Sequence, residues 1–108
     1  MANTFKLKTK KNVGVTTSPL YVVPSSTTTV VIGITASNIS GNNINVGIGI
    51  TRAAADDVHL MKNIPIPQGS SFEFMQGNKI VLETTDTITA RSDVNNSLDV
   101  ALTIMEIT

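Results

Sequence analysis

The chain has 108 residues, which predicts a single domain spanning residues 1–108. The charged fraction of 15 % lies below the roughly 25–35 % of a typical soluble monomer's surface, so the composition favours association with other subunits. Eight lysines and arginines balance eight aspartates and glutamates, and this lack of net positive charge argues against a nucleic-acid partner. There is no cysteine, which excludes disulfides, thiolate metal sites and a cysteine nucleophile.

The N-terminal segment, residues 1–11, is predicted to form a basic edge strand or arm. Phe5 and Leu7 alternate there with lysines. The lysines of this segment are Lys6, Lys8, Lys10 and Lys11. No apolar stretch follows them, and no run in the chain approaches the roughly 18 apolar residues of a membrane helix, so we expect a soluble protein that starts near Met1 and has no membrane partner.

Two interpretations of this basic strand stay open. Lysines commonly protect an exposed sheet edge from pairing with other chains. Alternatively, the lysines dock onto an acidic partner, where each exposed ion pair contributes about 0.2–1 kcal/mol. The two interpretations differ in salt dependence, because docking by lysines weakens at high salt whereas a protective edge leaves attachment unchanged.

Apolar and polar residues alternate through the following segments, which predicts strands and no long helix. Residues 20–23 form a short strand and residues 28–38 a longer one. In the longer strand we expect Ile32 and Ile34 to face the core, and Gly33 to face the other way.

The segment INVGIGI, residues 44–50, carries two glycines in an alternating strand. Its isoleucines and valine would fill the core, whereas Gly47 and Gly49 leave the opposite face almost without side chains. We expect these two glycines, together with Gly33, to form a flat patch against which another protein surface lies. The alternative is a bulged or strongly bent strand inside a monomer.

The C-terminal half continues the alternation. Pro65 and Pro67 indicate a segment that crosses between the sheets or runs along an edge, because proline donates no ladder hydrogen bond. Phe72 and Phe74 share the inner face of the next strand. The residues that we expect in the core are Ile32, Ile34, Val46, Ile48, Ile50, Phe72, Phe74, Val100, Leu102 and Ile104.

Eight or nine short strands with turns about every ten residues are typical of an all-β protein. We therefore predict an antiparallel β-sandwich, either jelly-roll or immunoglobulin-like, rather than a closed barrel.

The residues that could carry chemistry are few. His59 is the one histidine, and the acidic residues near it, Asp56 and Asp57, lie at a predicted turn, where aspartate is favoured in any case. The other carboxylates occupy turns or polar positions of alternating strands, and no G-x-S-x-G motif is present. We expect no catalytic residues, no metal site and no cofactor, and hence no enzyme.

Three segments resemble a family of small virion structural proteins of tailed bacteriophages, including cyanophages. They are LYVVPSSTTTVVIGITASNIS, KNIPIPQGSSFEF and GNKIVLETTDTITARSDVNNSLDVALTIMEI, with the motifs P-x-x-x-x-T-V-V-I-G, P-I-P-x-G-S-S and D-V-x-L-x-I-x-E-I. The resemblance implies a non-enzymatic building block located in the virion and assembled in the host cytoplasm. It also implies other virion proteins as partners, either the major capsid protein or tail proteins, and we expect a homo-oligomer.

Within that family the resemblance leaves the placement open. A short chain without coiled-coil heptads favours a capsid decoration or cement protein that binds and stabilises the assembled particle. The first alternative is a module of the tail, neck, baseplate or fibre. The second is a host-surface module that binds a glycan. The residues expected at a partner interface are Lys6, Lys8, Lys10, Lys11, Gly33, Gly47 and Gly49.

Overall fold

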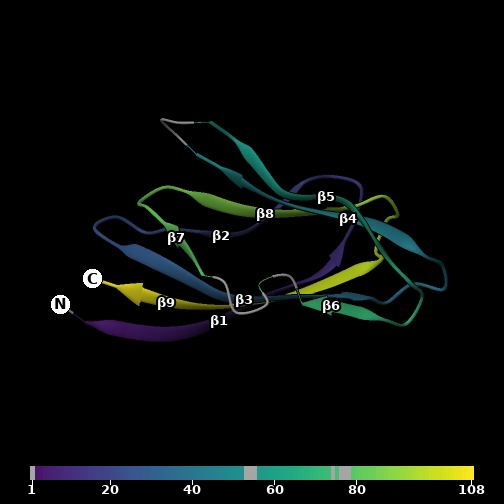
Figure 1. Ribbon diagram of the computed structural model, residues 1–108, viewed down its shortest axis with the longest axis horizontal. Coiled ribbons are helices and arrows are strands. Elements are labelled where there is room, and N and C mark those ends of the chain that lie inside the picture. Colours follow the sequence, from purple (N-terminus) through teal and green to yellow (C-terminus); the bar gives the residue numbers. More distant parts are fainter. Residues whose placement is uncertain (1, 53–55, 74, 76–78) are drawn as a thin grey trace.

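The computed structural model describes residues 2–52, 56–73, 75 and 79–108, which form nine β-strands in two antiparallel sheets. Figure 1 shows the sheets as two layers, with β1, β9, β3 and β6 in one and β2, β8, β4 and β5 in the other. This arrangement confirms the predicted all-β sandwich. No helix in the described residues is long and apolar enough to cross a membrane.

The first sheet has the strand order β1–β9–β3–β6, with β7 also paired to β3. Its strands are β1 (Asn3–Val13), β9 (Leu98–Ile107), β3 (Thr28–Asn38), β6 (Ser71–Glu73) and β7 (Ile80–Leu82). The second sheet has the order β2–β8–β4–β5. Its strands are β2 (Ser18–Val22), β8 (Thr87–Ser92), β4 (Ile44–Thr51) and β5 (Val58–Ile66).

The strand order distinguishes the two expected kinds of sandwich. Both β6 and β7 pair with the edge of β3 that faces away from β9, so together they form one interrupted edge strand. In an immunoglobulin domain the first two strands share a sheet, whereas β1 and β2 here lie in different sheets. With β6 and β7 counted as one strand, the order is that of a jelly roll.

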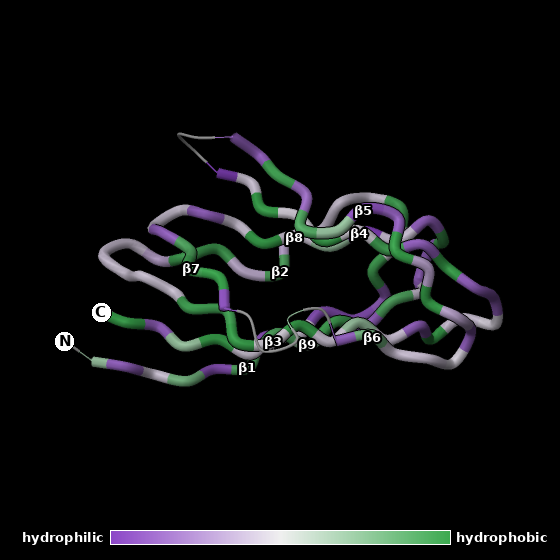
Figure 2. Tube along the Cα trace, in the orientation of Figure 1, coloured by the Kyte–Doolittle hydropathy of each residue, from purple (hydrophilic) through white to green (hydrophobic). Residues whose placement is uncertain are grey.

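The core lies between the two sheets, and β4 and β9 contribute alternate residues to it; Figure 2 shows this alternation of hydropathy along the chain. Of the residues expected in the core, the buried ones are Ile34, Val46, Ile48, Ile50, Val100, Leu102 and Ile104. Phe72 is half-buried and packs against the core. Phe74 lies outside the described residues.

The prediction for Ile32 is wrong, because a β-bulge interrupts the alternation of β3. Val31 pairs with Ile104 and Gly33 with Thr103, so β3 contains one extra residue against β9 at this point. The bulge exchanges the two faces of the strand, so that Val31 is fully buried and Ile32 only half-buried. Strict alternation resumes beyond the bulge, where Ile34 is buried.

Pro65 lies at an edge, which is one of the two expected arrangements, and Pro67 follows the end of the same strand. Pro65 is part of β5, the last strand of the second sheet, where it pairs with Asn45. At an edge strand a missing backbone N–H is tolerated if it would face solvent.

Candidate interaction surfaces

An apolar row crosses the outer face of the first sheet. It consists of Phe5, Met105, Val30 and Val81, which are successive cross-strand partners on β1, β9, β3 and β7. We call these four residues the outer apolar row. Phe5 is 70 % exposed and Val81 is 61 % exposed. Leu7, two residues from Phe5 on the same face of β1, is 65 % exposed.

Single exposed apolar residues are common on proteins, but contiguous ones mark contact surfaces. Fully burying such a side chain contributes about 1.5–3 kcal/mol. Because Phe5, Leu7 and Val81 are 61–70 % exposed, covering their exposed parts would contribute roughly 3–6 kcal/mol in total. The outer apolar row is therefore the strongest candidate for a protein contact on the described surface.

Three of the lysines of β1, Lys6, Lys8 and Lys10, lie on the opposite, inner face of that strand. Lys6 and Lys8 pair with Ile104 and Leu102, which are both buried between the sheets. The alternation of β1 is thus reversed relative to a usual sandwich strand, with basic side chains inward and apolar side chains outward. This is possible because β1 is an edge strand, where long lysine side chains reach water at the open side of the sandwich.

Two of the four lysines are held by internal contacts. Lys6 Nζ lies 2.8 Å from Glu106 Oε1, and Lys8 Nζ lies 5.8 Å from the centre of the Tyr21 ring. Lys10 and Lys11 are exposed. Of the lysines expected at an interface, Lys6 and Lys8 therefore contact residues of the fold, whereas Lys10 and Lys11 are exposed to solvent.

Glu106 and Tyr21 form a buried polar network beside these lysines. The Tyr21 hydroxyl donates a hydrogen bond to Glu106 Oε2 and accepts one from Thr29 Oγ1, 2.8 Å away. The hydrogen bond from Lys6 holds the pKa of Glu106 below its usual value, and burial raises the pKa of Tyr21 to about 12. At neutral pH the carboxylate is charged and the phenol is neutral, so the network ties β1, β2, β3 and β9 together.

The sequence contains a signal for Glu106 that reading the carboxylates as turn or polar positions did not use. In β9 the buried positions are Leu98, Val100, Leu102 and Ile104, and Glu106 continues that alternation. A carboxylate at an inward position requires a partner, because an unpaired buried charge is costly. The position of Glu106 thus indicates a buried carboxylate that must be paired, although not its partners.

The three glycines do not form the single patch that we expected. Gly47 and Gly49 lie on the outer face of the second sheet, where they pair with Arg91 and Thr89 of β8. Gly33 lies on the first sheet, where a Cβ would be 3.6 Å from the Glu73 carboxylate. The glycines therefore belong to opposite sides of the sandwich, because alternation within a strand does not indicate to which sheet the strand belongs.

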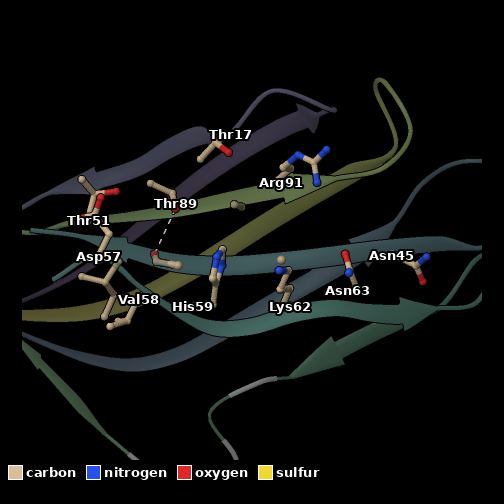
Figure 3. Close-up of a pocket in the computed structure, with 14 residues that line it drawn as sticks. Thr17, Asn45, Thr51, Asp57, Val58, His59, Lys62, Asn63, Thr89 and Arg91 are labelled. Atoms are coloured by element: carbon tan, nitrogen blue, oxygen red, sulfur yellow. Dashed lines mark hydrogen bonds between the residues drawn. The ribbon is translucent and has the colours of Figure 1, made fainter.

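A groove of about 300 Å³ runs over Gly47 and Gly49. In Figure 3, Arg91 and Thr89 lie on one side of β4, and His59 and Lys62 lie on the other. Within the described residues, no three histidine, aspartate or glutamate side chains gather as a metal site would require.

The close approach of β5 explains one of the two glycines of β4, Gly49. The pairing of β4 with β5 shifts register between Val46 and Ile48 and again between Ile48 and Gly49. As a result, the Val58 carbonyl oxygen lies 3.1 Å from where a Cβ of Gly49 would be. At Gly47 the corresponding distance, to the Met61 carbonyl oxygen, is 3.5 Å, which is ordinary contact. At Gly49 the bulged-strand interpretation is thus favoured over the flat patch.

No family model and no curated protein matches the chain. The fold is similar to that of a solved chain from Bacillus endospore appendages, which are described as a novel family of disulfide-linked pili. The TM-score is 0.59 and the sequence identity 13 %, over 99 % of this chain and 87 % of that chain. At this identity the likeness shows the sandwich fold alone, and the present chain has no cysteine.

Proposed function

We propose that the chain is a non-enzymatic structural subunit that binds other protein subunits of an assembled particle. The observation that carries this proposal is the outer apolar row, which stands on a regular four-stranded surface and exposes Phe5 and Val81 to water. A subunit that stays covered in its assembly keeps such a surface without cost to its solubility.

A structural role also agrees with the internal contacts of two groups whose pKa values are shifted. The Glu106 carboxylate contacts Lys6 and Tyr21, and the Tyr21 hydroxyl contacts Glu106 and Thr29. Groups tied up in this way stabilise the fold rather than exchange protons with a substrate.

The particle that we propose is the virion of a tailed bacteriophage, and the role is capsid decoration, in which the chain binds the major capsid protein and stabilises the head. The sequence resemblance supports a virion role, and a fold without a coiled-coil or shaft-like extension in the described residues favours decoration over a fibre module. A jelly roll is among the folds that capsid proteins use.

Immunogold electron microscopy of purified particles, with an antibody against this chain, tests the placement. We expect gold over the head. Label confined to the tail or neck would assign the chain to a tail module, and particles without label from a lysate that contains the chain would refute a virion role.

A binding assay tests the outer apolar row itself. We expect Val81→Thr to weaken co-sedimentation of the purified chain with particles that were assembled without this chain. The matched control is Val58→Thr, which makes the same exchange at a residue 46 % exposed on the second sheet. Both positions are exposed, so both changes should alter stability by less than about 0.5 kcal/mol. Equal binding by the two variants would refute a contact through the first sheet.

A further inference from the structure

The four edges of the sandwich differ in how well they are protected from strand pairing. The edge strands β6 and β7 have three residues each. In the second sheet, β2 contains Pro19 and β5 contains Pro65, and both strands have register shifts against their neighbours. Short strands, prolines and bulges are the features that prevent an edge from accepting another strand.

The edge strand β1 lacks those features over most of its length. It has 11 residues and no proline, and its pairing with β9 is regular from Asn3 to Lys10. A long, regular edge is a template for an additional strand.

The backbone groups at the free edge of β1 follow from the first pair of the ladder. Ala2 and Thr108 exchange both backbone hydrogen bonds, with N to O distances of 3.1 Å and 3.0 Å. Hydrogen-bonded pairs alternate along an antiparallel ladder, so the even-numbered residues up to Lys10 also bond to β9. The N–H and C=O groups directed away from β9 are those of Asn3, Phe5, Leu7 and Thr9.

The side chains of β1 determine which strand this edge can accept. Antiparallel pairing of two β1 strands would set lysines beside lysines on the inner face, and like charges opposite one another destabilise a sheet. A strand with carboxylates on the inner face would instead place them beside Lys10, which is exposed, and beside the half-buried Lys8, whose ammonium lies over the Tyr21 ring. On the outer face its apolar residues would extend the surface of Phe5 and Leu7.

We propose that β1 binds an extended segment of a partner protein as an added strand, and that this segment alternates acidic and apolar residues. The lysines thus have two effects: they reject a second copy of β1 and select an acidic strand. This inference rests on the proposed function in that the partner is another subunit of the particle, and it names the chemistry of the contact. In such strand addition the main-chain hydrogen bonds give affinity and the alternating side chains give specificity.

A labelled peptide of alternating glutamate and valine residues tests the proposal on the full chain by fluorescence anisotropy. We expect saturable binding that weakens severalfold from low to high salt, because exposed ion pairs are screened. The control peptide, in which lysine replaces each glutamate, should not bind. Equal binding of the two peptides would overturn the charge selection, and binding of neither would overturn the proposal.

Two substitutions at one position separate the edge from the outer face. Leu7→Pro removes an N–H that points away from β9, so it should weaken peptide binding about tenfold or more while β1 stays paired. Leu7→Thr removes the apolar side chain but keeps the N–H, so its loss should be much smaller. Equal losses in both variants would assign the contact to the face and overturn strand addition.

Amide hydrogen exchange of the unaltered chain gives a measurement that does not depend on the folding of Leu7→Pro. The peptide should slow exchange at Phe5, Leu7 and Thr9, whereas the amides of Lys6 and Lys8 are already protected by β9. Unchanged exchange at the odd-numbered residues would overturn strand addition. If strand addition failed these tests but Val81→Thr still weakened particle binding, the proposed function would stand without strand addition at β1.

Discussion

The two glycines of β4 predict opposite effects of one substitution. A Cβ added at Gly47 meets only the Met61 carbonyl oxygen at 3.5 Å, so alanine fits there. Because alanine has less backbone freedom to lose on folding, Gly47→Ala should stabilise the protein by about 0.4–1 kcal/mol. Neither glycine has a positive φ, so alanine meets no backbone strain at either position.

At Gly49 the added methyl group meets two close neighbours. It would lie 3.1 Å from the Val58 carbonyl oxygen and 3.3 Å from Thr89 Oγ1. The carbonyl belongs to the backbone of β5, which must move by a few tenths of an ångström to restore ordinary contact. Overpacking of this kind costs about 1–3 kcal/mol, which exceeds the entropic gain, so Gly49→Ala should destabilise the protein by about 1 kcal/mol.

Urea unfolding of both variants measures the difference. With an m-value of about 1–3 kcal/mol/M, the two midpoints should move in opposite directions, and the m-value itself should not change. If Gly49→Ala were as stable as Gly47→Ala, the close approach of β5 would not be the reason for glycine at residue 49. Gly47→Lys then tests the flat patch, because a contact surface loses assembly at an unchanged melting temperature, whereas a strained strand loses stability first.

Four further predictions concern the core, the network of Glu106 and Tyr21, and the edge strand β1. In urea unfolding, Ile48→Ala should lower the free energy of unfolding by about 2–5 kcal/mol, and Ile32→Ala, at a half-buried position, by only about 1 kcal/mol. Equal losses in the two variants would contradict the bulge that turns Ile32 away from the core. The pKa of Glu106 is lowered in the folded state, so its charge stabilises the fold above its unfolded pKa of about 4.3. This contribution is lost as the pH falls through the lowered pKa. Glu106→Gln should therefore flatten the acid limb of a curve of stability against pH. Because the Tyr21 pKa is raised to about 12, stability should fall between about pH 10 and 12, and Tyr21→Phe should abolish that loss. Lys10→Thr should increase aggregation in light scattering if lysines keep β1 from pairing with itself, and unchanged scattering would argue against that protection.

The sequence predicts the layered fold well because the alternation is local. The strand expected at residues 28–38 is observed as Thr28–Asn38, and the glycine-containing strand at 44–50 as Ile44–Thr51. Each of these strands has one face that must be buried, and turn-forming residues separate it from the next.

The errors arise where a distant strand decides the outcome. Ile32 faces away from the core because β9, some seventy residues away in sequence, pairs with β3 across a bulge. The reversed faces of β1 depend on Glu106 and Tyr21, which supply partners for lysine at the open side of the sandwich. The separation of Gly33 from Gly47 depends on sheet membership, which alternation within a strand does not encode.

The uneven protection of the edges limits the valency of the subunit. If β1 takes up a strand, the opposite edge of the same sheet, formed by the short strands β6 and β7, offers no matching site for the next one. A subunit of this kind would bind one partner segment and offer no second edge for a further strand. The number of bound copies would then equal the number of partner segments that the particle presents. Growth along an axis by the same mechanism would require a donor and an acceptor edge on every copy.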